Sequence, residues 1–579
     1  MKSSRNIFEI IIHFLKNELK ILKIKFEYIC TFLNEISLYK YLLSITNLNK
    51  NLGIFLSKYK NEYIHKLVKS FKDQKKNIKD NKKLVFVESF INHPLYTIPN
   101  CFIAKNISDE IGAECCGILR AGDITGSKIM GGFGVNKIIY INDGNFFLRL
   151  YYLFISYNHL KKLKSIKDLI NFKIDKIEYG QAIYEQQIRF KKNPEIKTIN
   201  IDFYLLLSKA MIHNYQFKNI FNKYTSSYLV QSETQYYPFR VCLQNALKFN
   251  LKVVSKRGIS LNGIRVYKNF SERNENRNKI SRKIFSMYYS KFNKKNLSIV
   301  NSLFLNHNKK NMGKDTYQQL NKERKVYKII NSKKNICLNF KWDLSKPIVI
   351  ILAHELTDGN LNNTWNLFEN DMFWLKETLK KISNIDNVNW LIKPHPSEKI
   401  YNAKISTEIL FQKYCNNKRN IKLFPTNLKI NNIEKIYHSA ITSHGSAGFE
   451  FPGFSIPTVI CGDTPYSSLG FNIEPKTKSH YFKILKNIKY LKLSSEAKAK
   501  CRFFNFLTHY LFIVKNPIVY ESDITMKYNK EKFWLNSLKI LKNHKNFNEN
   551  FKSSLNNLIK SNNSILIDLN KFNLLKKDH

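Results

Sequence analysis

A histidine held between two prolines follows an apolar segment that predicts a β-strand. Val388–Ile392 is followed directly by Lys393, Pro394, His395 and Pro396. The prolines stiffen the loop and fix the direction of the imidazole between them, and the lysine adds a positive charge. A charge and a directional donor suit a phosphate or diphosphate. We therefore predict that Lys393 and His395 bind an anionic group, with a purely structural histidine as the alternative.

A second loop with phosphate-binding chemistry has the sequence SHGSAGFE, from Ser443 to Glu450. Glycine tolerates unusual backbone dihedrals and leaves neighbouring amides accessible, and the helix expected next places partial positive charge at the same point. Glu450, one turn into that helix, is expected to accept hydrogen bonds from ribose hydroxyls. A strand-to-helix turn capped by serine is the alternative. The residues predicted to bind a nucleotide here are Ser443, His444, Gly445, Ser446, Gly448 and Glu450.

Two further loops add hydroxyl and titratable groups. GDTPYSS (462–468) offers the hydroxyls of Tyr466, Ser467 and Ser468, and an ordinary turn is the alternative. HELTDG (354–359) offers His354 and Asp358 as a general acid or base. This loop lacks a second histidine four residues after the first, so the sequence excludes a zinc protease of the HExxH type.

The first half of the chain contributes fewer candidates. Glu185 and Arg189 share one helix face at a spacing of four, which predicts an ion pair that is either solvated or lines a cleft on the acceptor side. Asp143 follows the apolar segment Ile138–Ile141 and is a candidate general base, although an Asp-Gly turn is the commoner role for such a pair.

The four loops of the second half all follow predicted strands, and this sets the expected fold. Ligands of open α/β sheets bind outside the carboxyl ends of the strands, so the alignment supports one common site. Strands alternate with helices in both halves of the chain, which predicts two Rossmann-like domains. We expect a basic helical region (1–80), an N-terminal Rossmann-like acceptor domain (81–270), a helical linker (271–345), a C-terminal Rossmann-like nucleotide-sugar domain (346–480) and a helical region (481–579).

Composition limits the class of protein. A hydrophobic fraction of 43% excludes a disordered chain. The net charge of +51 comes from lysines spread along the whole sequence, whereas a nucleic-acid-binding protein would concentrate them, so we predict no specific nucleic-acid partner. The nine cysteines lack zinc-ribbon spacing, which predicts reduced thiols and a cytoplasmic protein. No segment is long and apolar enough to span a bilayer.

The segment Ile7–Leu15 predicts an amphipathic helix rather than a signal peptide, because it is short and contains Glu9. Packing against the protein is the expected role of its apolar face. Peripheral contact with the inner face of the membrane is the alternative, supported by the flanking lysines.

Several segments, in order along the chain, resemble capsule and surface polysaccharide biosynthesis proteins. They are IDKIEYGQAIYEQQIRF, IVIILAHELTDG, FENDMFWLKETLKKI, NVNWLIKPHPSE and TSHGSAGFEFPGFSIPTVICGDTPYSSLGF. The resemblance extends over roughly residues 84–510 and is strongest over 347–482. It implies a GT-B-like fold, with two Rossmann-like domains facing a cleft, related to Kdo- and sialic-acid-transferring enzymes.

The resemblance also implies a function. In the related enzymes a His-Pro motif and a Ser/Thr motif hold the donor phosphate, which assigns this role to His395 with Ser446 or Ser467 and Ser468 beside it. The acidic base of the sialyltransferase-like groups lies in a paired-acid-Gly motif, and the sequences around Asp143 and Asp358 both lack the paired acid. The HGSAGFE segment also resembles the ribose- and phosphate-binding turn of UDP-N-acetylglucosamine 2-epimerases.

The expected function is therefore a glycosyltransferase of the bacterial cell envelope. It would use a CMP- or UDP-activated sugar and a polysaccharide or lipid-linked glycan acceptor, with no cofactor and no metal. The alternatives are a CDP-polyol phosphotransferase of similar fold and a basic polyanion-binding protein without catalysis.

Overall fold

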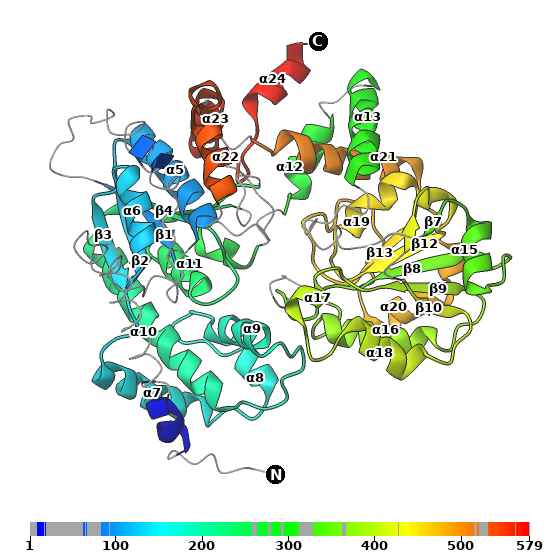
Figure 1. Ribbon diagram of the computed structural model, residues 1–579, viewed down its shortest axis with the longest axis horizontal. Coiled ribbons are helices and arrows are strands. Elements are labelled where there is room, and N and C mark those ends of the chain that lie inside the picture. Colours follow the sequence, from blue (N-terminus) through cyan, green and yellow to red (C-terminus); the bar gives the residue numbers. More distant parts are fainter. Residues whose placement is uncertain are drawn as a thin grey trace, which may run out of the picture.

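The computed structural model of the chain describes residues 9–16, 18, 62–63, 65–66, 83–91, 93–256, 263–275, 279–290, 294–311, 328–359, 361, 366–425, 428–514, 518–519, 531–542, 544–561 and 563–577. Most of the predicted N-terminal region (1–80) lies outside these residues. Two α/β domains stand side by side in Figure 1, the first with its sheet labelled β1 to β4 and the second with β7 to β13.

The first domain is built on a six-stranded sheet in the order β3-β2-β1-β4-β5-β6, parallel except for the β5–β6 pair. Its central strand has the sequence LVFVES and is buried at every position, as a strand covered on both faces must be. The strands are β1 (Leu84–Ser89), β2 (Glu114–Arg120), β3 (Lys137–Ile141), β4 (Ser226–Gln231), β5 (Lys252–Ser255) and β6 (Arg265–Tyr267).

The helices of the first domain are unevenly distributed between its strands. Four of them, α7 to α10, are inserted between β3 and β4 and form the lower part of this lobe (Figure 1). The helices are α5 (Pro94–Ile111), α6 (Ile124–Gly132), α7 (Phe146–Leu160), α8 (Ile166–Ile170), α9 (Tyr179–Lys191), α10 (Ile201–Lys223), α11 (Phe239–Lys248) and the 3₁₀ turn Phe270–Asn274.

The second domain has a five-stranded, fully parallel sheet in the order β10-β9-β8-β12-β13. Counted within each domain, both sheets follow the strand order 3-2-1-4-5 of a Rossmann fold. The strands are β8 (Ile348–Leu352), β9 (Asn389–Lys393), β10 (Ile421–Leu423), β12 (Ser439–Thr442) and β13 (Thr458–Ile460). A separate two-stranded sheet pairs β7 (Lys328–Ile330) with β11 (Leu428–Ile430).

Amphipathic helices cover the second sheet. Helix α16 begins where Asn370 accepts a hydrogen bond from the amide of Phe373, and its buried face includes Trp374 and Leu379. The main helices are α15 (Lys333–Phe340), α16 (Asp371–Ile382), α17 (Glu398–Tyr401), α18 (Thr407–Cys415), α19 (Ala447–Glu450), α20 (Lys478–Lys486) and α21 (Ser495–Phe506), the last continued by a π-helical turn (Leu507–Leu511). Helices α12 (Arg282–Ser290) and α13 (Lys294–Asn311) pack on this domain, where Phe285 contacts Phe503.

The chain then returns to the first domain. Helices α22 (Glu531–Lys542) and α23 (His544–Lys560) pack against α5, with the rings of Phe102 and Phe551 4.8 Å apart, and α24 spans Leu569–Lys577. Beyond α23, Ile565 forms an antiparallel bridge with Arg265 on the edge strand β6. The predicted C-terminal helical region thus contributes to the core of the first domain.

The predicted fold class is confirmed: the chain has a GT-B-like α/β architecture with two Rossmann-like domains. The strands predicted from the apolar segments Ile138–Ile141 and Val388–Ile392 are present as β3 and β9. In the described part of the chain, no helix combines the length and the apolar character needed to cross a bilayer.

Candidate active site between the two domains

Three histidines converge at the carboxyl edge of the second sheet. His354 follows β8, His395 follows β9 and His444 follows β12, and these three strands are neighbours. The ring of His354 lies 4.1 Å from that of His444 and 5.6 Å from that of His395, measured between centroids. The loops that the sequence predicts to share one site therefore do meet.

A buried aspartate that sequence reasoning missed lies between two of these rings. Asp371 is the first residue of α16, and its carboxylate oxygens lie 3.4 Å from Nδ1 of His354 and 3.4 Å from Nδ1 of His444. Burial, partly offset by Asp371, lowers the pKa of His444 to about 4. The sequence pattern pointed to residues that follow strands, and Asp371 instead stands at the start of a helix. The helix-capping Asn370 before it is the sequence feature that marks this position.

His395 is oriented by its own loop. Its Nδ1 accepts a hydrogen bond from the amide of Ser397 (3.3 Å), and the hydroxyl of Ser397 bonds to the same atom. Burial, together with neighbouring His354, lowers the pKa of His395 to about 3, so the ring is neutral. A neutral ring that accepts a hydrogen bond at Nδ1 carries its proton on Nε2. The Nε2–H group of His395 can therefore donate a hydrogen bond to a ligand. Lys393 lies beside this loop, with Nζ 5.4 Å from the centre of the Phe424 ring.

The HGSAG turn is tightly built on one side and open on the other. A Cβ on Gly448 would lie 2.1 Å from the hydroxyl of Tyr466, so only glycine fits there without movement. That hydroxyl donates to the carbonyl of Gly445. Ser446 is exposed and does not cap α19 with its side chain. Glu450 is half-buried, and burial raises its pKa, opposed by a hydrogen bond with Ser446.

Two of the three hydroxyls predicted from the 462–468 loop are engaged inside the protein. Tyr466 is buried against the glycine turn, and Ser467 bonds to the amide and hydroxyl of Thr464 at 2.7 and 2.8 Å. Ser468 has a left-handed backbone (φ 68°), and its amide donates to Glu474 at 2.6 Å. The hydroxyls of Tyr466 and Ser467 thus hold the loop together, whereas a ligand role for the hydroxyl of the half-buried Ser468 stays a prediction.

The predicted ion-pair helix of the first domain meets the loop after β8. Arg189 on α9 forms an ion pair with Asp358, and the hydroxyl of Tyr236 donates to the same carboxylate. The guanidinium also stacks on the rings of Tyr236 and Tyr401, 5.0 and 5.1 Å from their centroids. Tyr236 follows β4 and Tyr401 ends α17, so this cluster joins the carboxyl edges of both sheets.

Glu185, one turn before Arg189, is buried in the same contact. One of its oxygens accepts a hydrogen bond from the amide of Leu361, while the other has no hydrogen-bond partner among the described residues. Burial raises the pKa of Glu185 to about 7, although the Leu361 amide opposes the shift. Gln181 donates to the carbonyl of Leu361 and so holds the same loop.

Asp143 has its own partners in the first domain. It follows β3, the outer strand of the first sheet, and pairs with Lys209 at 2.9 Å and with His213 at 3.5 Å. Burial alone would raise its pKa, but His213 and Lys209 outweigh burial and lower it. His213 also contacts the hydroxyl of Tyr237 at 2.7 Å, next to Tyr236 of the cluster, and the role of Asp143 as a general base stays a prediction.

Comparisons with known proteins do not assign a role to these residues. No family model and no curated protein matches the chain. Similar solved structures include a β-Kdo 2,4-transferase of Thermosulfurimonas dismutans (12% identity, 50% of this chain and 87% of that chain, TM-score 0.23) and a glycosyltransferase of Rickettsia africae (11%, 81% and 100%, TM-score 0.25). A UDP-GlcNAc 2-epimerase of Methanocaldococcus jannaschii is a third (11%, 74% and 99%, TM-score 0.23). With such scores, the fold assignment rests on the strand order described above.

Proposed function

We propose that this chain is a glycosyltransferase that moves a sugar from a CMP- or UDP-activated donor to a capsular or other surface polysaccharide. The observation that carries the proposal is the meeting of His354, His395 and His444 with the glycine turn at one sheet edge, opposite Arg189 of the other domain. The neutral imidazole of His395, backbone amides and a nearby lysine match the anionic part of a nucleotide-sugar. No organic cofactor is part of the proposal.

The donor is proposed to bind on the second domain. His395 would donate from Nε2 to the phosphate, and Ser446, exposed at the start of α19, would add a hydroxyl. Glu450 would accept from the ribose. The acceptor would enter from the first domain, next to α9.

Glu185 is proposed as the general base that takes the acceptor proton. A general base works best when its pKa lies near the working pH, and the pKa of Glu185 is raised to about 7. Asp358 is less suited, because Arg189 and Tyr236 engage its carboxylate. A Glu185→Gln variant should lose activity by about 10² or more with the donor KM unchanged. Full turnover in this variant would remove Glu185 from the role.

The donor site is tested by nucleotide binding. Saturation-transfer NMR with CMP, UDP and CDP-glycerol should show one clear preference, and His395→Ala should weaken binding of the preferred nucleotide at least about tenfold. His480→Ala is the matched control, because His480 is an exposed histidine on α20. Unchanged affinity in His395→Ala would refute the donor site, and a preference for CDP-glycerol would favour a polyol-phosphate transferase.

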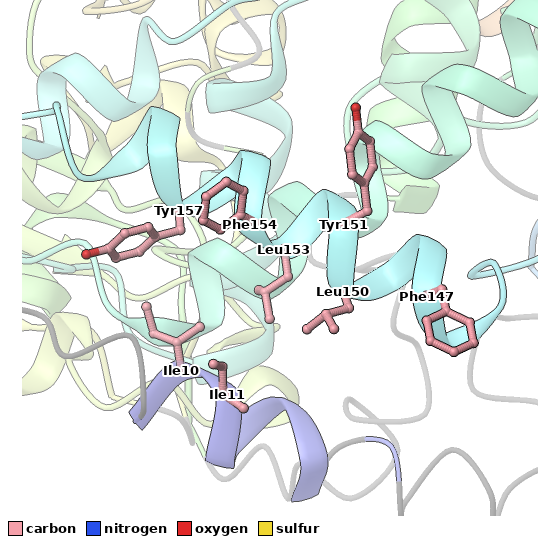
Figure 2. A pocket seen from close by; sticks show the side chains of 8 residues that line it. All are labelled: Ile10, Ile11, Phe147, Leu150, Tyr151, Leu153, Phe154 and Tyr157. Atoms are coloured by element: carbon pink, nitrogen blue, oxygen red, sulfur yellow. The ribbon is translucent and has the colours of Figure 1, made fainter.

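A surface of the first domain supports peripheral membrane contact, in keeping with a lipid-linked acceptor at the inner face of the membrane. Helix α7 and the helix at residues 9–16 enclose an apolar pocket of about 420 Å³ (Figure 2). Around it, Phe147 is 78% exposed and Tyr151 60% exposed. Residues 137–176 carry eight lysines and arginines against three aspartates. Aromatic side chains flanked by basic residues suit the interface of an anionic bilayer.

This contact is tested with lipid vesicles. The full chain should sediment with vesicles that contain phosphatidylglycerol and less with pure phosphatidylcholine. A Phe147→Ser, Phe154→Ser double variant should bind at least about tenfold more weakly, whereas Phe190→Ser should bind normally, because Phe190 is equally exposed but lies on α9. Equal binding by all three proteins would contradict the membrane contact.

A further inference from the structure

Three side chains of metal-binding type face one another at the carboxyl edge of the second sheet. The possible ligand atoms of His354, Asp371 and His444 all lie within 4.8 Å of one another. We propose that this trio binds a divalent transition metal ion of the zinc class. The proposal departs from the metal-free donor site that the resemblance to GT-B glycosyltransferases implies.

The backbone places the two histidines together. Strands β8 and β12 are paired in parallel, with Leu352 opposite Thr442. His354 and His444 each stand two residues beyond that pair, so they leave the sheet at matching positions. Asp371 comes from a different element, the first turn of α16. The three ligands therefore lie far apart in sequence, and no spacing motif could reveal them.

The distances suit a metal better than hydrogen bonds. Each imidazole Nδ1 lies 3.4 Å from an oxygen of Asp371, beyond the usual range for an N–H···O bond of about 2.7–3.2 Å. Ligands about 2.0–2.1 Å from a tetrahedral zinc ion are about 3.4 Å from each other. Nδ1 of His354 also lies 3.2 Å from the carbonyl of Glu355. If Nδ1 donates to that carbonyl, the lone pair that can ligate the metal is on Nε2.

Burial adds an independent argument. Asp371 is only 4% exposed, and its Oδ2, like Nδ1 of His444, has no hydrogen-bond partner among the described residues. Within the described part of the chain, the two histidines are the ion-pair partners of this carboxylate. A buried carboxylate without a compensating cation is costly. A metal ion between the three side chains would satisfy both orphan atoms at once.

The number of ligands indicates the kind of site. Three protein ligands leave a coordination position open, as in catalytic rather than structural zinc sites. Two imidazoles and one carboxylate also suit iron, manganese or cobalt. His395, 5.6 Å from His354 between ring centroids, would place a donor phosphate beside the open position. That last step rests on the proposed function; metal binding itself does not.

The experiment uses the full chain. Elemental analysis after dialysis against metal-free buffer should find close to one zinc, iron, manganese or cobalt ion per chain. Calorimetric titration of the stripped protein with Zn²⁺ should give one tight site, and Co²⁺ should produce the visible absorption of a tetrahedral complex. Asp371→Asn and His444→Ala should each weaken Zn²⁺ binding at least about tenfold, and His480→Ala should not. Circular dichroism verifies that each variant is folded.

Two results would overturn the proposal. One is the absence of stoichiometric metal and of a cobalt spectrum in the folded protein. The other is Zn²⁺ binding that Asp371→Asn, His354→Ala and His444→Ala all leave unchanged. Nucleotide binding by the stripped protein is measured separately, so a failure of the metal site remains distinct from a failure of the donor site.

Discussion

Two buried carboxylates, one in each domain, are held in opposite ways. Glu88 is the last but one residue of β1 in the first sheet. Its oxygens accept hydrogen bonds from the backbone amides of Phe90 and Ser232, the hydroxyl of Ser232 and the side-chain amide of Asn100. Asp371 of the second domain has two histidines at 3.4 Å and an oxygen without a hydrogen bond among the described residues. Buried polar groups are normally hydrogen-bonded, and one that is not calls for an explanation. Glu88 fits a structural role, whereas the open oxygen of Asp371 is the one that the proposed metal ion would satisfy.

The sharpest test of this contrast is stability. Removing the centre of a satisfied network leaves several buried donors unpaired, so Glu88→Ala should lower the free energy of unfolding by about 3–5 kcal/mol. Asp371→Asn removes a buried negative charge that no lysine or arginine balances among the described residues, so it should change the free energy of unfolding by less than about 1 kcal/mol. Urea denaturation measures both variants. A larger loss for Asp371→Asn than for Glu88→Ala would break the comparison.

Glu185 lies between Glu88 and Asp371 in this comparison, because one of its oxygens accepts a hydrogen bond and the other has no partner among the described residues. Its contribution to the stability of the protein should therefore depend on pH. Its pKa is raised to about 7 in the folded protein against about 4.3 when unfolded, so the folded state binds its proton more tightly. Its contribution to stability is therefore fully present below pH 4.3 and is lost as the pH rises through 7. Between pH 5 and 8 the wild type should lose roughly 2–3 kcal/mol relative to Glu185→Gln. Parallel pH profiles of the two proteins would show that the carboxyl titrates normally.

The glycine turn beside the site offers a smaller test of close packing. Gly448→Ala should cost about 1–3 kcal/mol, because its methyl group meets the Tyr466 hydroxyl. The same change in a Tyr466→Phe background should cost less, since the nearest atom is gone. Gly131→Ala on α6 is the matched control, because a Cβ there has no neighbour within 4 Å among the described residues. Thermal unfolding of the four variants, including the double variant, measures the coupling.

The sequence predicted the fold well because apolar runs such as Ile348–Leu352 are long enough to identify buried parallel strands. It also predicted that the loops after those strands meet, because parallel strands share one edge. It could not find Asp371, which depends on how α16 packs, nor show that Lys209 and His213 hold the carboxylate of Asp143. The inward-turned hydroxyls of Tyr466 and Ser467 likewise depend on tertiary contacts.

The return of the chain to its first domain has a consequence for biosynthesis. Phe551 and Leu555 fill the core beside α5, and Ser564 and Leu566 hydrogen-bond to Val266 and Ile264 at the border of the first sheet. Until these residues have left the ribosome, the apolar face of α5 stays exposed to solvent. One edge of β6 likewise lacks the backbone hydrogen bonds that Ser564 and Leu566 later make. The second domain also packs against the end of this stretch, where Ile565 and Ile567 join the buried cluster around Phe503. The half of the protein that is translated first thus cannot complete its fold until the last residues have been made.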